Sequence, residues 1–268
     1  GPVVSEGDDD GKRYAYRCVF HDPRAVDLNM LHLESASSVD AAMAVANQSG
    51  SPRLNCIAAD VVGNVGWTLA GRMPKRLAPA QPTAVDWSVQ DNNWSELLPA
   101  EEYPRIVQPE SGRVWNANDR VLGQEYLELM GYGDLAFGAR STQIRDRLFG
   151  QERFDEAGLQ AIQLDYEAIY MQYWQQLLLE TATADSASLS DKCIAAVEDW
   201  GGKAAVDSVG YRVVSEFRSN VFKAIFGFHS LIGDQPVPAG SLADVLQLRA
   251  GWVAMNYDDA ALDLLAAR

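Results

Sequence analysis

The chain has 268 residues, of which 47% are hydrophobic, and its formal net charge is −15 with a pI near 4.5. A chain of this length can bury a substantial core, as one large domain or two small ones. The negative charge argues against nucleic acid as a partner, because no basic field offsets the repulsion from phosphates. The sequence also lacks an apolar run of 18 residues and an export signal, so it predicts no membrane partner.

Cysteine and histidine usage limits the metal and disulfide chemistry that we expect. Cys18, Cys56 and Cys193 lie far apart in apolar contexts, and their odd number is incompatible with complete pairing within one chain. We expect them to be plain buried thiols. The three histidines do not show the i, i+4 spacing of a helical zinc pair. The sequence therefore predicts no metal site and no cofactor.

The first fifty residues predict a hairpin followed by a helix. Val3–Val4 and Tyr14–Phe20 are strand-like and flank a polar turn. The acidic run Asp8–Asp10 in that turn lacks the spacing of a calcium loop, so we expect a solvated turn. Behind Ser38, a serine N-cap, apolar residues recur at helical spacing, and the segment from Asn47 to Pro52 ends this helix.

The segment from Asn55 to Arg76 is the most informative part of the sequence. Cys56–Asp60 is a short apolar run, Val62–Asn64 tolerates positive φ, and Val65–Leu69 is a second apolar run. This pattern predicts a β-hairpin. The hairpin carries an amide at its head and a guanidinium at its end, and both groups suit the stabilisation of a developing oxyanion.

Loops are expected between this hairpin and residue 150. Pro99, Pro104 and Pro109 break any long helix, while Arg113–Trp115 predicts a short strand. That strand leads to a polar cluster made of Asn116, Asn118, Asp119 and Arg120. We interpret the cluster as satisfying loop backbone groups, with direct substrate contact as the alternative.

The second half of the chain predicts helices. One broad apolar stripe at three- and four-residue steps consists of Leu159, Ile162, Tyr166, Ile169, Tyr170, Tyr173 and Leu177. Further helices are predicted over Ser190–Asp199 and Gly210–Phe226, and Gly240–Arg268 shows more helical spacing. We therefore expect an α+β protein with a strand- and loop-rich part over residues 1–150 and a mainly helical part over residues 151–268.

Two motifs resemble a known family in order and spacing. NCIAADVVGNVGWTLAGRMPKR fits N-x-x-x-A-D-x-x-G-N-[IV]-G-[WY]-x-x-x-G-x-x-P-x-R, and GRVWNANDRV fits G-x-x-x-x-A-N-[DN]-R-[VI]. Both resemble the penicillin acylase (penicillin amidase) family of N-terminal-nucleophile hydrolases. The resemblance covers most of the chain, most densely residues 50–150. It implies an internal portion of the large (β) subunit and part of an αββα sandwich.

The resemblance also implies a reaction. Its members hydrolyse linear amides through an acyl-enzyme, using an N-terminal serine that autoproteolysis exposes. Asn55 matches the family asparagine that helps hold the oxyanion, and Arg76 matches the arginine that orients Asn55 and the surroundings of the nucleophile. Expected substrates are an acylated β-lactam or an N-acyl homoserine lactone.

The chain begins with Gly1, which has no side-chain nucleophile. The resemblance therefore places the nucleophile and the small subunit on other acylase segments, which would be the partners of this chain. We expect the isolated chain to be inactive. The resemblance implies a periplasmic or secreted location.

Two further expectations concern the hairpin. The oxyanion assignment requires Asn55 to lie beside a cleft, and an Asn55 side chain directed to bulk solvent at a sheet edge, with no cleft beside it, would overturn the acylase interpretation. Some relatives bind a structural calcium ion, which is left open for the parent enzyme, and Asp60 is a candidate oxygen ligand. We instead expect Asp60 to accept backbone N–H groups from the turn that follows it.

Two other function classes remain open. The chain could be a self-contained enzyme with a carboxylate pair, either Asp119 with Glu125 or Asp165 with Glu167. It could also be a non-catalytic ligand-binding or assembly module derived from the acylase scaffold. In that case four aromatic residues would line a groove: Trp87, Trp94, Tyr103 and Trp115.

Overall fold

The computed structural model divides the chain into two compact units, Gly1–Gly133 and Asp134–Arg268. The residues that it describes are 2–4, 13–80, 84–94, 96–121, 123–131, 135–184 and 189–226. The acidic run Asp8–Asp10 and the helical spacing of Gly240–Arg268 lie outside these residues. The sequence-based boundary near residue 150 stays a prediction.

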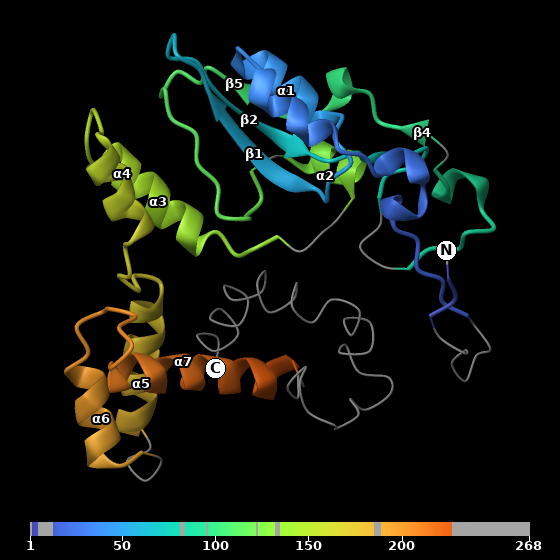
Figure 1. Cartoon of the computed structure of the whole chain (residues 1–268). Coiled ribbons are helices and arrows are strands. Elements are labelled where there is room, and N and C mark those ends of the chain that lie inside the picture. The colour runs from blue at the N-terminus through green and yellow to red at the C-terminus, as the bar shows by residue number, and fades with distance from the viewer. Residues whose placement is uncertain are drawn as a thin grey trace. The chain divides into compact units, whose positions relative to one another are not determined.

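A three-stranded antiparallel sheet in the order β1-β2-β5 forms the framework of the first unit (Figure 1). Its strands are β1 (Leu54–Ala59), β2 (Val65–Ala70) and β5 (Arg105–Val107). Asn55 lies opposite Leu69 in the β1–β2 pair, which confirms the predicted hairpin. The sequence analysis does not predict β5, because three residues are too few to show alternation.

Helix α1 (Val39–Asn47) covers one face of this sheet. The predicted cap is confirmed, since the Ser38 hydroxyl accepts the Ala41 N–H at 3.2 Å. At Gly66 of β2, a Cβ atom would lie 2.7 Å from a Val39 methyl group, so this close approach depends on glycine. The helix buries Val39, Met43 and Ala46.

A buried polar contact fixes α1 to the sheet. Asn47 donates from Nδ2 to the Thr68 hydroxyl at 3.0 Å and to the Leu69 carbonyl at 2.7 Å. The Thr68 hydroxyl in turn donates to the Pro104 carbonyl at 2.8 Å. Both side chains are buried, so these bonds replace the water that the groups lose on folding.

The opposite face of the sheet carries the core of the first unit. It is formed by Trp67, Leu69, Met73, Leu98 and Tyr103. A second, two-stranded sheet pairs β3 (Pro74–Lys75) with β4 (Glu96–Leu97), and α2 (Gln124–Met130) follows the loops. Five short 3-10 helices connect these elements: Val19–His21, Pro23–Ala25, Asn29–Ser35, Gln90–Asn92 and Ala100–Glu102.

Two strand predictions in the first unit are wrong. The N-terminal hairpin is reduced to one antiparallel bridge between Val3 and Ala15, and the chain turns into a 3-10 helix at Val19. The predicted strand over Arg113–Trp115 is irregular in the structure. Apolar residues alone do not form a strand unless a neighbouring strand supplies the hydrogen bonds.

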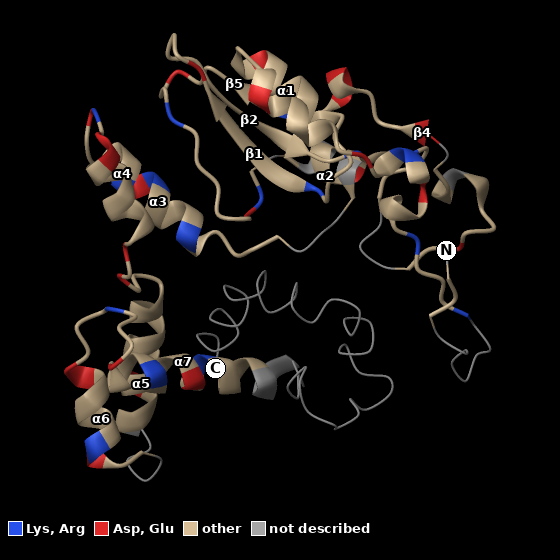
Figure 2. Ribbon diagram, in the orientation of Figure 1, with Lys and Arg blue, Asp and Glu red and all other residues tan. Residues whose placement is uncertain are grey.

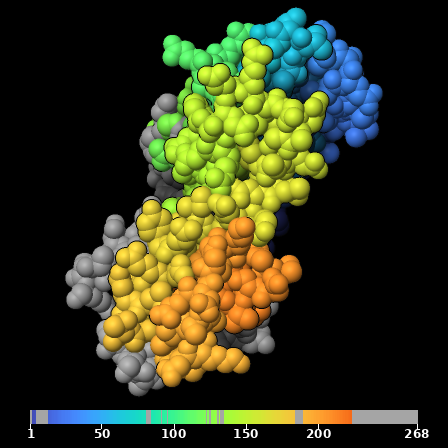
Figure 3. Space-filling view, turned by 90° about the vertical axis from the view of Figure 1, so that its left-hand side faces the viewer, coloured from blue at the N-terminus to red at the C-terminus, as the bar shows by residue number. Residues whose placement is uncertain are grey.

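The second unit is helical. It contains α3 (Ala139–Phe149), α4 (Glu156–Gln163), α5 (Met171–Ala184), α6 (Asp191–Glu198) and α7 (Val209–Phe226). Helices α5, α6 and α7 contact one another, and Figure 3 shows the gold and orange parts of the second unit packed together. Their shared core consists of Trp174, Leu178, Val197, Trp200, Val214 and Phe222.

The single apolar stripe that the sequence predicts is broken into two helices. Residues 164–170 between α4 and α5 are not helical, and Glu167 forms a bridge with Lys203. As a result Tyr166 and Tyr173 are 53% and 64% exposed, and the core is centred on Trp174 instead. The helices predicted over Ser190–Asp199 and Gly210–Phe226 are confirmed as α6 and α7.

The expectations for the cysteines and for membrane-spanning segments can be compared with the structure. Cys18, Cys56 and Cys193 are free, but each is half-buried rather than fully buried. Among the described residues, the helices are too short or too polar to cross a membrane.

Gly71 generates a stability prediction with a matched control. It has a φ of +92°, and a Cβ atom there would lie 2.4 Å from the Ser51 carbonyl oxygen. Gly63 has a similar φ of +93°, but open space surrounds it. We expect Gly71→Ala to lower the free energy of unfolding by roughly 2–5 kcal/mol and Gly63→Ala to lower it by roughly 1–2 kcal/mol. Both variants place a Cβ atom on a residue with positive φ, but only Gly71→Ala also brings it into a backbone clash.

Urea denaturation midpoints of the protein that carries this chain measure both costs. Equal losses for the two variants would contradict the tight packing at Gly71.

Candidate active site

Asn55 lies on β1, an edge strand of the three-stranded sheet, and its side chain is exposed. This exposure at a sheet edge is contrary to the expected position beside a cleft, so the oxyanion role of Asn55 stays a proposal. Its carboxamide oxygen accepts the indole N–H of Trp67 at 3.0 Å. An indole nitrogen is a donor only, so it must face the oxygen and not the nitrogen of the amide. The amide NH₂ group is therefore directed away from Trp67 and remains a donor for another acceptor.

Arg76 directly follows β3 and is partly buried. Burial lowers the pKa of its guanidinium, and the charge of Arg53 lowers it further. The Nε atom is buried without a hydrogen-bond partner, and Arg76 takes part in none of the ion pairs found among the described residues. Its guanidinium carbon lies 5.1 Å from the centre of the Trp94 ring.

Gly131, at the end of α2, brings Arg76 toward the start of β1. The Arg53 side chain, two residues before Asn55, donates to the Gly131 carbonyl at 3.3 Å. A Cβ atom at Gly131 would lie 2.6 Å from an Arg76 guanidinium nitrogen. The φ of Gly131 is +89°, which also favours glycine. The two predicted site residues thus lie toward the same end of β1.

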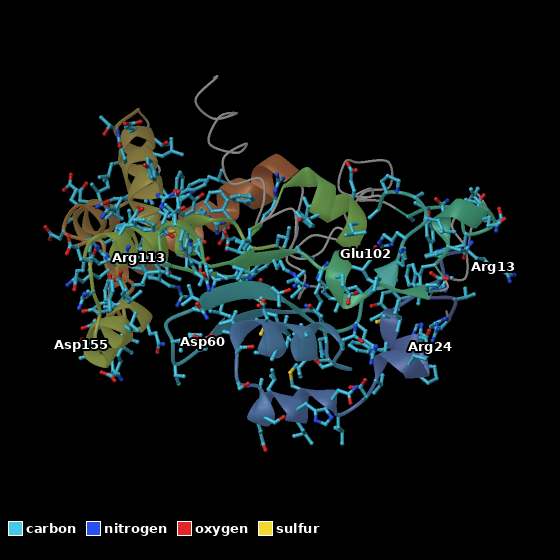
Figure 4. The ribbon with its side chains drawn as sticks, turned by 90° about the horizontal axis from the view of Figure 1, so that it is seen from above. Arg13, Arg24, Asp60, Glu102, Arg113 and Asp155 are labelled. Carbon is cyan, nitrogen blue, oxygen red and sulfur yellow. The ribbon has the colours of Figure 1, made fainter. Side chains whose placement is uncertain are left out.

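Asp60 stabilises the hairpin turn, as predicted. One carboxylate oxygen accepts the backbone N–H groups of Val62 at 3.1 Å and Asn64 at 2.9 Å. The other accepts the Asn64 side-chain amide at 2.8 Å. These bonds, with those from Asn64 foremost, lower the pKa of Asp60. Figure 4 labels Asp60 at the hairpin tip, where its carboxylate oxygens accept these bonds from the turn.

The polar cluster of the second motif also stabilises its own loop. Asp119 accepts the Ala117 N–H at 3.2 Å and the Asn116 side-chain amide at 3.3 Å. The Asn116 side-chain oxygen accepts the Asn118 N–H at 2.8 Å, and Asn118 has a φ of +66°. The interpretation that the cluster satisfies loop backbone is confirmed for Asn116 and Asp119.

The alternative carboxylate pair, Asp165 with Glu167, is bound by one arginine. Arg147 donates to Asp165 at 2.9 Å and to Glu167 at 2.5 Å. Burial raises the pKa of Asp165, but hydrogen bonds from Gln143 and Arg147 outweigh it and lower the pKa overall. The Asp165 carboxyl is therefore not held protonated as a general acid would be. For the other pair, the side chain of Glu125 lies outside the described residues.

The predicted aromatic groove is wrong for Tyr103. This residue is 3% exposed within the core, where its hydroxyl donates to the Gly71 carbonyl and accepts the Met73 N–H. Trp87 and Trp94 do form a pair, with ring centres 5.4 Å apart in an edge-to-face contact.

Two features of the site are missed by the sequence analysis. The first is the bond from Trp67 to Asn55, for which the signal was the [WY] position of the first motif. The second is the contact of Trp94 with Arg76. It joins residues across loops and leaves no local pattern.

Comparisons with known proteins identify the relatives of this chain. A family model described as penicillin amidase matches residues 1–263. The chain is 27% identical over 111 residues to penicillin acylase 2 proenzyme from Pseudomonas sp. (strain SE83), a match that covers 41% of this chain and 14% of that protein.

A solved structure shows the same fold. Thermostable penicillin G acylase from Alcaligenes faecalis superposes with a TM-score of 0.58 and 16% identity. The match covers 98% of this chain and 56% of the other, so this chain spans little more than half of it. The likeness confirms the α+β class and the N-terminal-nucleophile hydrolase fold.

Asp165 generates a pH-dependent stability prediction. The pKa of Asp165 in the folded state is below the ordinary 3.8. Its contribution to the free energy of unfolding is therefore complete above pH 3.8 and is lost as the pH falls through the folded pKa. Asp165→Asn should cost about 1 kcal/mol or less at pH 7, because Arg147 is partly exposed. The difference from wild type should shrink below pH 3.8.

Urea midpoints measured above and below pH 3.8 check this, with the exposed Asp207→Asn as the control. A difference that stays constant across the whole range would exclude the proposed linkage.

Proposed function

The chain belongs to the penicillin amidase family, and we propose that it forms part of an amidohydrolase that cleaves linear amides through an acyl-enzyme. The substrates proposed are acylated amines of the β-lactam or homoserine lactone type. The observation that carries this proposal is the bond from Trp67 to the Asn55 carboxamide oxygen. It leaves an oriented amide donor on an otherwise apolar strand.

In the proposed reaction, Asn55 stabilises negative charge. Attack on the amide carbonyl moves electrons onto its oxygen, and the Asn55 NH₂ group donates a hydrogen bond to that oxyanion. Because Trp67 already holds the other end of the carboxamide, Asn55 need not reorient as the charge develops. A donor fixed in advance stabilises the transition state more than the ground state.

Arg76 supplies a positive charge near this donor. Its guanidinium is partly buried and takes part in none of the ion pairs of the described residues, so its field is not cancelled by a carboxylate in contact. We propose that it orients Asn55 and the region around the nucleophile. In a chain with a net charge of −15, such an arginine is a local site of attraction for a developing anion.

We propose that the nucleophile and the small subunit lie on other segments of the parent enzyme. The matches cover 56% of the related solved structure and, over 111 residues of this chain, 14% of the curated proenzyme, which leaves room for these parts. Those segments would enclose Asn55, which is exposed in this chain, and so form the cleft that the oxyanion role requires. Export to the periplasm or the cell exterior is part of the same proposal.

Replacing Asn55 tests the proposed role directly. In the full-length protein, Asn55→Ala should lower kcat by about 10²–10³, because one oxyanion donor is lost. KM should change only a few-fold, since the donor acts mainly in the transition state. Trp67→Phe should give a smaller loss, because the amide remains but is no longer oriented.

Steady-state hydrolysis of a chromogenic acyl amide provides both constants. With kcat referred to the amount of folded protein, an unchanged kcat in Asn55→Ala would remove Asn55 from the mechanism.

A second test concerns the isolated chain. We expect it to release no acid from a phenylacetyl amide or a long-chain acyl amide, because the proposed nucleophile is on another segment. Product release is followed by chromatography, with the full-length protein as the positive control. Steady turnover by residues 1–268 alone would show that the nucleophile has been misplaced.

A further inference from the structure

Two guanidinium groups lie over one indole ring in the first unit. The Arg76 guanidinium carbon is 5.1 Å from the centre of the Trp94 ring, and that of Arg17 is 4.3 Å from it. Both distances are within the range of cation–π attraction. Trp94 therefore connects Arg76 to Arg17 and the loop that carries it.

Arg17 fixes Trp94 in three ways. Besides lying over its ring, Arg17 donates to the Trp94 carbonyl oxygen and, at 3.2 Å, to the side-chain oxygen of the adjacent Asn93. It also lies 5.4 Å from the Trp87 ring, which meets Trp94 edge to face. Arg17 and Trp94 both line a cavity of about 580 Å³, so close packing does not confine the ring on that side.

The loop that carries Trp94 is held by its own side-chain amides. Asn93 donates to the Trp87 carbonyl at 3.0 Å, and Asn92 donates to the Asp86 carbonyl at 2.7 Å. These bonds link the two ends of the loop between Trp87 and Trp94. Arg17 then clamps this loop at its last residue.

From this arrangement, we propose that Trp94, clamped by Arg17, is a positioning residue for Arg76 in the acylase reaction. An aromatic face restrains a guanidinium through its quadrupole and leaves the positive charge uncancelled, whereas a carboxylate would neutralise it. The buried Nε atom of Arg76, which has no partner, fits this arrangement. The inference rests on the proposed function, because it assigns Trp94 a role in that site.

Kinetics of the full-length protein test the inference. Trp94→Leu should lower kcat about 3- to 30-fold, the range that loss of a cation–π contact implies, with KM nearly unchanged. Trp94→Phe keeps an aromatic face and should restore most of the lost rate. Trp94→Leu combined with Arg76→Ala should be no slower than Arg76→Ala alone, because Trp94 acts through Arg76.

A labelling experiment tests the positioning without relying on activity. Phenylglyoxal modifies guanidinium groups, and peptide mass spectrometry gives the rate at each arginine. Arg76 should react several-fold faster in Trp94→Leu than in the wild type or Trp94→Phe. Arg212, whose side chain is 79% exposed in the second unit, should react at the same rate in all three.

The outcomes separate the two proposals. Faster labelling of Arg76 with the expected loss of kcat supports the inference. An unchanged Arg76 labelling rate in Trp94→Leu overturns it, as does a rate loss that adds in full to that of Arg76→Ala. A wild-type protein without amidase activity instead overturns the proposed function, and the role of Trp94 in that reaction falls with it.

Discussion

The hydrogen bond from Trp67 to Asn55 connects the core of the first unit to its candidate site. Trp67 is 2% exposed, and its ring packs with Leu69 and Met73 on one face of the sheet. A buried indole N–H that lacks an acceptor is costly, so the core itself requires an acceptor at that position of β1. Asn55 fulfils this requirement with its oxygen. The same bond that satisfies the core therefore orients the amide donor, and any change that moves Trp67 also moves the donor.

Arg76 is also held by a tryptophan, but through a cation–π contact and not through a hydrogen bond. One side of its guanidinium meets the Gly131 backbone, and another meets the Trp94 ring. Moving a cation out of water has a large cost, which a carboxylate usually offsets. Here an aromatic face offsets part of it, and the lowered pKa of Arg76 reflects the burial that remains. In Asn55 the supported oxygen is separate from the amide nitrogen that could act on a substrate, whereas in Arg76 the guanidinium itself makes the supporting contact.

The parts of the fold that the sequence predicts are those with local causes. The hairpin follows from the turn that Asp60 holds, and α1 and α6 follow from the serine caps Ser38 and Ser190. The interruption between α4 and α5 was not predictable from periodicity, because Arg147 and the bridge to Lys203 impose it from a distance. Asn55 and Arg76 were identified by motif spacing, but their supports were only partly visible. Arg17 and the Trp94 carbonyl are 77 residues apart, and no window of sequence contains both.

The edge of the sheet gives a physical reason to expect further segments beside β1. Edge strands of self-contained proteins are usually protected by charge, proline or a covering element. The six residues of β1 carry neither charge nor proline, and Figure 2 shows β1 and β2 without charged side chains. Leu54 and Ile57 are 53% and 49% exposed on this strand. Among the described residues β1 pairs only with β2, and an apolar edge of this kind is suited to pairing or burial. A segment placed there would cover β1 and at the same time enclose the exposed amide of Asn55, so completion of the sheet and completion of the proposed site would be one event.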